Sequence, residues 1–188
     1  MSVNKINTRT IVLLVFILSM GLFRWISQDM GALSNFTPVG AIALFAGVYF
    51  KDKWKAYMAP LGTLLISDMA INYISSGSFF YPGMLYVYIA FALMVTLGSM
   101  IQTVNVSRIL GGALGVVLIH WLVTDIGVWL SGTLYPMTAA GLWECLVAAI
   151  PFEKNFLVGT LIYTVVMFGG YELLGYKFPQ LKLVPSVE

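Results

Sequence analysis

Long apolar runs fill most of this sequence, and polar or turn-forming residues separate them. A helix that crosses the hydrocarbon core of a bilayer needs about 20 mostly apolar residues. Only 10% of the residues are charged, against about 25% in ordinary soluble domains. These polar residues are too few to cover an apolar core in water, so the sequence predicts an all-helical integral membrane protein. Residues 1–188 are predicted to form a single transmembrane domain.

Six of the apolar runs are predicted to span the membrane. They cover about residues 10–27, 36–50, 54–75, 84–102, 107–130 and 155–175. A further run over 139–150 ends at Pro151 and is too short to span, so we interpret it as a short re-entrant or interfacial helix between the fifth and sixth spans. No small-residue cleavage site follows the first run, and we therefore expect an uncleaved first helix rather than a signal peptide.

Lysine and arginine residues predict the orientation of the chain, because they are enriched in cytoplasmic loops. If the N-terminus lies in the cytoplasm, only Arg24 and Lys154 of the 10 basic residues fall in the outer half. Both termini are therefore expected in the cytoplasm. Glu172, near the cytoplasmic edge, is expected to pair with Lys177 or to reach the lipid headgroups.

Ionisable side chains inside the predicted spans are candidates for function, because they are costly in a bilayer unless they are paired or solvated. With a rise of about 1.5 Å per residue, Arg24, Asp68 and His120 lie about 20 Å from the inner surface and Asp125 about 27 Å. Glu144 belongs to the short outer segment. All five are predicted to lie in the outer half.

Helical spacing arranges the polar residues of two spans into stripes. The stripes consist of Asp68, Asn72 and Ser75 on the third span, and of Trp121, Asp125 and Trp129 on the fifth. Carboxylates beside indole rings suit a small-molecule site, with the rings supplying flat apolar area. The predicted substrate-binding residues are Arg24, Asp68, Asn72, His120, Trp121, Asp125, Trp129, Trp143 and Glu144.

Structural roles are the alternative for several of these residues. Trp25 and Trp129 could belong to the aromatic belt at the membrane interface. Asp68 could pair with Arg24 only to hold two helices together, and His120 could be a satisfied interior histidine. Since His120 and Asp125 are five residues apart, they are expected to face about 140° apart on their helix.

Several kinds of chemistry are not predicted. A single cysteine excludes an internal disulfide, and a single histidine excludes bis-histidine haem and the HExxH zinc signature. The sequence contains neither a P-loop nor a GxSxG motif. We therefore expect no enzyme, no cofactor and no metal site, and any pumping would need an ATPase partner. Cys145 is interpreted as a small apolar residue.

Several stretches resemble a family of small uncharacterised bacterial membrane proteins. They are NFTPVGA at 35–41, LISD at 65–68, LVTDIGVWL at 122–130, YPMTAAGL at 135–142 and AAIPF at 148–152. The resemblance extends from about Arg24 to Thr160. That family is in turn similar to the substrate-binding S-components of energy-coupling-factor (ECF) vitamin transporters.

The resemblance implies six helices in the bacterial inner membrane and a vitamin-like ligand bound at the outer face. Cobalamin is one candidate ligand, and His120 or Cys145 would then coordinate its cobalt. It also implies an energising module of one membrane scaffold and two ATPases. S-components dock the scaffold through an Ala-x-x-x-Ala patch on the first helix. Residues 11–21 lack such a patch, and Ala43-x-x-x-Gly47 is the nearest substitute. A solitary transporter therefore stays open.

The resulting hypothesis is a membrane subunit that captures a vitamin-like small molecule for uptake. Two alternatives stay open. In a non-catalytic assembly subunit of a larger membrane complex, the stripe around Asp125 would contact a neighbouring protein. A small ion-coupled carrier would need a continuous polar path, to which the predicted inner half contributes only Glu172.

Overall fold

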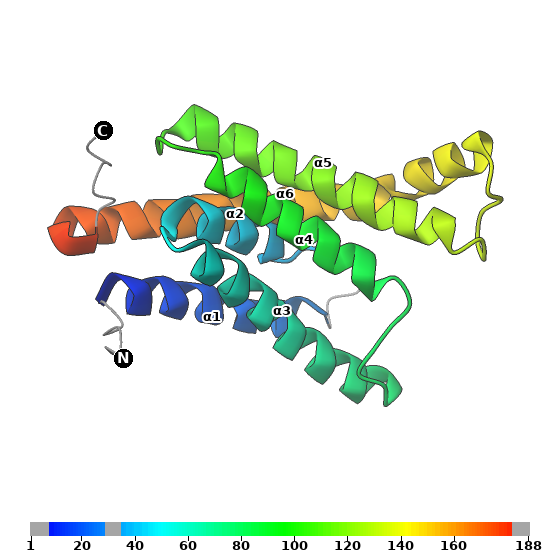
Figure 1. The fold of residues 1–188 in the computed structure, drawn as a ribbon, viewed down its shortest axis with the longest axis horizontal. Coiled ribbons are helices and arrows are strands. Elements are labelled where there is room, and N and C mark those ends of the chain that lie inside the picture. The colour runs from blue at the N-terminus through cyan, green and yellow to red at the C-terminus, as the bar shows by residue number, and fades with distance from the viewer. Residues whose placement is uncertain (1–7, 29–34, 182–188) are drawn as a thin grey trace.

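The computed structural model describes residues 8–28 and 35–181, and this part of the chain is all helical, without strands (Figure 1). The elements are α1 (Thr8–Gln28), α2 (Val39–Tyr49), α3 (Lys53–Ser76), α4 (Met84–Ser99), α5 (Val106–Leu130), α6 (Ala139–Lys177) and a 3-10 turn, η2 (Pro179–Leu181). The first five helices match the predicted runs to within three residues at each end. The all-helical prediction is confirmed for the described residues.

Helix α2 forms the centre of the bundle and contacts each of the other five α-helices. In Figure 1, α5 runs along one side of it and α1 and α3 along the other, and α6 packs against it as well. Every residue from Gly40 to Tyr49 is buried. Because α2 is apolar on all of its faces, it is more stable inside the bundle than at its surface.

Two glycines allow the backbones of α2 and α4 to touch. A β-carbon on Gly47 would collide with the backbone oxygen of Val95, and one on Gly98 would lie 2.6 Å from the backbone oxygen of Leu44. This contact corrects the prediction that Ala43 and Gly47 could dock a scaffold protein. Both are buried against neighbours in the same bundle.

The prediction of a separate short helix over 139–150 is wrong, because α6 is continuous through this segment. The helix begins at a cap in which the hydroxyl of Thr138 accepts a hydrogen bond from the N–H of Gly141 at 3.1 Å. Pro151 lies inside α6 and removes one backbone donor, which bends a helix without ending it when packing holds both parts. The yellow first part of α6 is accordingly turned relative to the orange part (Figure 1).

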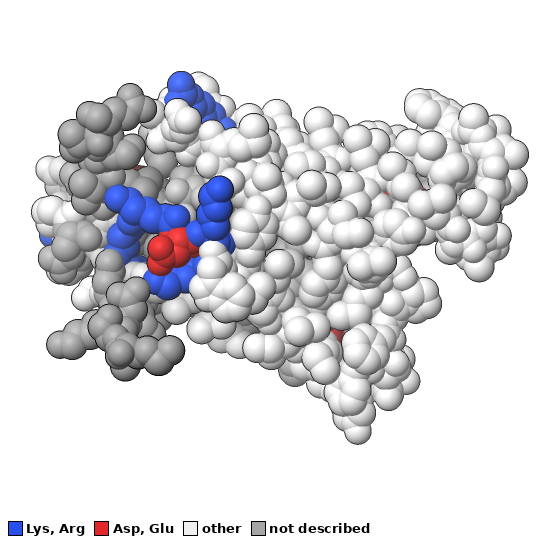
Figure 2. Space-filling view, viewed as in Figure 1, with Lys and Arg blue, Asp and Glu red and all other residues white. Residues whose placement is uncertain are grey.

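Charged and apolar side chains occupy different parts of the surface. Figure 2 shows the charged atoms gathered at the end of the bundle that carries the α2–α3 connection, where Lys51, Asp52 and Lys53 are exposed. The remainder of this face is almost free of charge. Large apolar side chains are exposed along the helices, among them Leu122 and Ile162.

Within residues 8–28 and 35–181, two helices, α5 and α6, are long and apolar enough by length and composition to cross a membrane. By contrast, α2 has 11 residues and is about 17 Å long, against about 30 Å for the hydrocarbon core. Length and composition thus support a membrane location, and they support only two of the six predicted spanning helices.

Polar side chains near the start of α1 and the end of α6 bond to one another. The hydroxyl of Tyr49 donates a hydrogen bond to Oε1 of Glu172. Arg9 donates to the backbone oxygen of Tyr49 at 2.6 Å, and its Nε donates to the hydroxyl of Tyr171 at 3.4 Å. Glu172 therefore has Tyr49 as its partner in place of the predicted Lys177.

Candidate functional site

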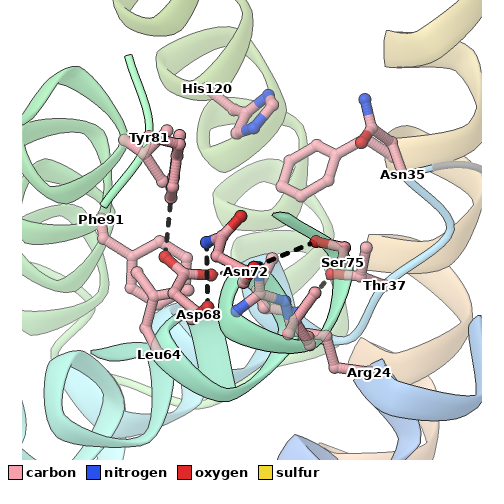
Figure 3. Close-up of a pocket in the computed structure, with 14 residues that line it drawn as sticks. Arg24, Asn35, Thr37, Leu64, Asp68, Asn72, Ser75, Tyr81, Phe91 and His120 are labelled. Carbon is pink, nitrogen blue, oxygen red and sulfur yellow. Dashed lines mark hydrogen bonds and ion pairs between the residues drawn. The ribbon is translucent and has the colours of Figure 1, made fainter. Parts of the chain in front are cut away.

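A cavity of about 380 Å³ lies among α1, α3, α4, α5 and α6 and the segment before α2 (Figure 3). Its apolar lining includes Leu64 and Phe91. Its polar lining consists of Arg24, Asn35, Thr37, Asp68, Asn72, Ser75, Tyr81 and His120. The polar stripe predicted on the third span therefore does face a single cavity. We call this space the first cavity.

Asp68 is the most heavily bonded side chain of the first cavity. It is 1% exposed and forms an ion pair with Arg24, the contact that the structural alternative for Asp68 required. The hydroxyls of Tyr81 and Tyr88 donate hydrogen bonds to its Oδ2 at 3.1 and 3.3 Å. Arg24 also donates to the hydroxyl of Ser67 at 2.7 Å. A buried charge is tolerated when its partners replace water in this way.

Tyr81 ties the α3–α4 connection to the wall of the first cavity. Burial, followed by the negative charge of Asp68, raises the pKa of Tyr81 well above its usual value. Its hydroxyl consequently stays protonated at physiological pH and remains a hydrogen-bond donor. Gly77 and Gly83 bound this connection with φ values of 70° and 83°, which glycine adopts without strain.

A second cavity, of about 390 Å³, lies between α5, α6 and the connection that joins them. It is lined by Asn35, Val87, His120, Thr124, Asp125, Val128, Leu134, Tyr135, Cys145, Ala148, Ala149, Phe152 and Glu153. Asn35, Val87 and His120 line the first cavity as well. The two cavities therefore adjoin.

His120 stands where the cavities meet. Its Nδ1 lies 2.7 Å from Oε1 of Glu153, and its ring stacks on that of Phe156 with the centroids 4.1 Å apart. In Figure 3 it faces Asn72 across the first cavity. Although His120 and Asp125 are separated around α5, both line the second cavity.

Two buried carboxylate oxygens of the second cavity have no hydrogen-bond partner among the residues that the structure describes. They are Oδ2 of Asp125 and Oε2 of Glu153. Glu153 is only 7% exposed. A buried carboxylate oxygen without a partner is costly, and these two atoms mark where hydrogen bonding beside the second cavity is incomplete.

The tryptophans of the predicted α5 stripe bond to the protein and line neither cavity. Nε1 of Trp121 donates to the backbone oxygen of Leu146 at 3.1 Å, and Nε1 of Trp129 donates to that of Pro136 at 3.0 Å. These bonds fasten α5 to α6 and to the connection between them. The two indole rings are therefore not part of the cavity lining to which Asp125 belongs.

Trp143 and Glu144 are exposed on α6, Trp143 by 69%, and neither lines a cavity. The side chain of Trp25 lies outside the described residues. The structure thus brings together five of the nine predicted residues. They are Arg24, Asp68, Asn72, His120 and Asp125.

Glu153 is the cavity residue that the sequence analysis missed. It lies after Pro151, where the short helix was predicted to end, and before residue 155, where the sixth span was predicted to begin. A signal was present: Cys145, Ala149 and Glu153 recur every four residues and share one helix face. That pattern has meaning only if the helix continues through Pro151, as it does.

Comparison with known proteins gives this chain a family without a known activity. No curated protein and no solved structure matches it. The sequence model of a family of unknown function, DUF6580, matches residues 4–181, which is nearly the whole chain. The predicted membership of an uncharacterised family is thereby confirmed, whereas the similarity to S-components stays a prediction. This chain belongs to the DUF6580 family.

Proposed function

We propose that this chain is a membrane-embedded, non-catalytic subunit that captures a small polar molecule at the outer end of its bundle. The observation that carries the proposal is the pair of adjoining cavities, of about 380 and 390 Å³, with Asp125 and Glu153 in the lining of the second. Small-molecule sites typically measure about 300–1,000 Å³ and combine an apolar lining with a few converging polar groups.

The proposed setting is the bacterial inner membrane, with all six helices within the bilayer and both termini in the cytoplasm. Exposed apolar side chains along the helices and charges at one end support this setting (Figure 2). The lysines near α2–α3 would lie in the cytoplasm. The cavities reach Tyr81 and Tyr135, in the two connections at the opposite end, and would open outward (Figure 1).

Cavities of this size suit a compact ring compound and would not hold a whole corrinoid. We therefore propose a vitamin-like ligand smaller than cobalamin. ATP-driven uptake would require an energising partner, since the sequence has no P-loop. A partner helix could pack on the exposed apolar face of α1, which consists of Ile11, Val15, Leu18 and Leu22.

The test is the small-molecule content of the purified protein. Wild type and Asp125→Ala are purified in mild detergent and denatured, and the released compounds are identified by mass spectrometry. We expect one compound at close to one molecule per chain in wild type and its loss in the variant, because Asp125 lines the second cavity. Glu144→Gln, an exposed change outside both cavities, should retain the compound.

Two results would count against capture. One is a wild-type protein that releases no compound and copurifies with other membrane subunits in a fixed ratio, which would favour an assembly role. The other is equal release from wild type and Asp125→Ala, which would place the compound elsewhere on the protein.

A further inference from the structure

The two cavities differ in the charged side chains that line them, and this difference bears on which charge a ligand can carry. In the first cavity, the charges of Arg24 and Asp68 neutralise each other in an ion pair. The second cavity is lined by two carboxylates, Asp125 and Glu153, and by no lysine or arginine among the described residues. The ionisable side chains of the second cavity are therefore two carboxylic acids and one histidine.

The unpaired oxygens of the second cavity are acceptors without donors. Oε1 of Glu153 is bonded to His120, which leaves Oε2 buried and free among the described residues. Oδ2 of Asp125 is in the same condition. Ionised carboxylate oxygens only accept hydrogen bonds. A ligand that bonds to the carboxylates lining this cavity must therefore present N–H or O–H donors, and positive charge on the donor strengthens each bond.

The remaining lining of the second cavity favours an organic ligand. Val128, Ala148, Ala149 and Phe152 supply apolar wall. Among the described residues, no three His, Cys, Asp or Glu side chains come together as a metal site would require. A flat group with two or more N–H donors can bond to the carboxylates while its body contacts the apolar wall.

We propose that the second cavity binds a small organic cation through an amidinium, guanidinium or protonated amine group held between Asp125 and Glu153. This inference rests on the proposed capture function and names the chemical class of its ligand. His120 is a positioning residue, because its bond to Oε1 of Glu153 fixes the carboxylate that faces the ligand.

Three probes of nearly equal shape separate charge from size. Benzamidinium is a cation with N–H donors, benzamide is neutral, and benzoate is an anion. Binding of each to purified wild type in lipid nanodiscs is measured by calorimetry. We expect benzamidinium to bind at least about tenfold more tightly than benzamide, the scale of one charged hydrogen bond, and benzoate to bind least.

Two conservative variants test the assigned carboxylates. Asp125→Asn and Glu153→Gln keep side-chain shape while removing charge, and each should weaken benzamidinium binding about tenfold or more. Glu144→Gln removes a carboxylate from the same helix as Glu153 but outside the cavities, and it should bind like wild type. Thermal melting of each variant shows whether it is folded.

Several outcomes would overturn the inference. They are an absence of benzamidinium binding, benzoate binding as tight as benzamidinium, and equal losses in Glu144→Gln and the cavity variants. The compound released from wild type on denaturation then separates the two proposals. A neutral or anionic compound that Asp125→Ala fails to retain would leave capture standing and refute the cationic class. If neither a released compound nor probe binding is found, both proposals fail.

Discussion

The ion pair between Arg24 and Asp68 is the side-chain interaction with the largest expected effect on stability. Asp68 is 1% exposed, and its other partners, Tyr81 and Tyr88, are neutral. Removing one member of a buried pair strands the other charge at a cost of about 3–5 kcal/mol. We therefore predict that Arg24→Met lowers the free energy of unfolding by about this amount, measured by reversible denaturation in detergent.

The double variant Arg24→Met with Asp68→Leu provides the control. Because it removes both charges, most of the lost stability should return. If Arg24→Met alone has the stability of wild type, the ion pair does not stabilise the fold, and Asp68 must draw its stabilisation from the tyrosines.

At the scale of single residues, some members of the site could be predicted from the sequence and others could not. Asp68 and Asn72 could be predicted to share a surface, because helical spacing places residues four apart on one face. Trp121 and Trp129 could not be placed, because each indole N–H bonds to a backbone oxygen of another segment. The position of such an acceptor depends on tertiary packing, which spacing within one helix does not contain.

At the scale of elements, the contact of α2 with α4 depends on the absence of side-chain atoms. A β-carbon at position 98 would lie 2.6 Å from the backbone oxygen of Leu44, and the backbone cannot move aside as a side chain can. We predict that Gly98→Ala lowers the free energy of unfolding by about 1–3 kcal/mol, as overpacking does. The measurement is the same reversible denaturation.

Gly111→Ala is the matched control, because the added carbon would meet nothing within 4 Å on helix α5. It should be neutral or stabilise by up to about 1 kcal/mol, since alanine favours a helix over glycine. Equal destabilisation by the two changes would contradict the proposed role of the α2–α4 contact and point instead to a general effect of the added methyl group.

Most element bounds followed from the sequence because apolar runs and turn formers alternate so regularly. The exception was α6, where Pro151 was interpreted as an end. Proline removes one hydrogen bond and bends a helix, and whether the helix ends there depends on neighbours that hold both parts together. Because the helix was predicted to end at Pro151, Glu153 was not assigned to the helix face of Cys145 and Ala149, with which it lines the second cavity.

At the scale of the whole molecule, the proposed orientation predicts which segments reagents can reach. Cys145 is the only cysteine, so Cys145→Ala gives a background for single cysteines. In intact cells, a membrane-impermeant maleimide should label Ser78→Cys and Thr133→Cys, in exposed connections at the cavity end. Asp52→Cys, at the lysine-rich end, should react only after the cells are opened.

The reverse pattern, with Asp52→Cys labelled first, would invert the orientation and place the cavities on the cytoplasmic side. Labelling of all three positions in intact cells would mean that the chain does not cross the membrane as proposed. Either result would be independent of whether a ligand is bound.

The buried central helix has a consequence for how the protein is made. Ribosomes synthesise α2 before α3, α4, α5 and α6, yet its final surroundings include all four. At about 17 Å, α2 is too short to cross the bilayer by itself before these later helices are made. Its contacts with α6 can form only once α6 has been synthesised, so the complete set of neighbours of α2 is assembled last. The order of translation and the order of assembly therefore differ in this protein.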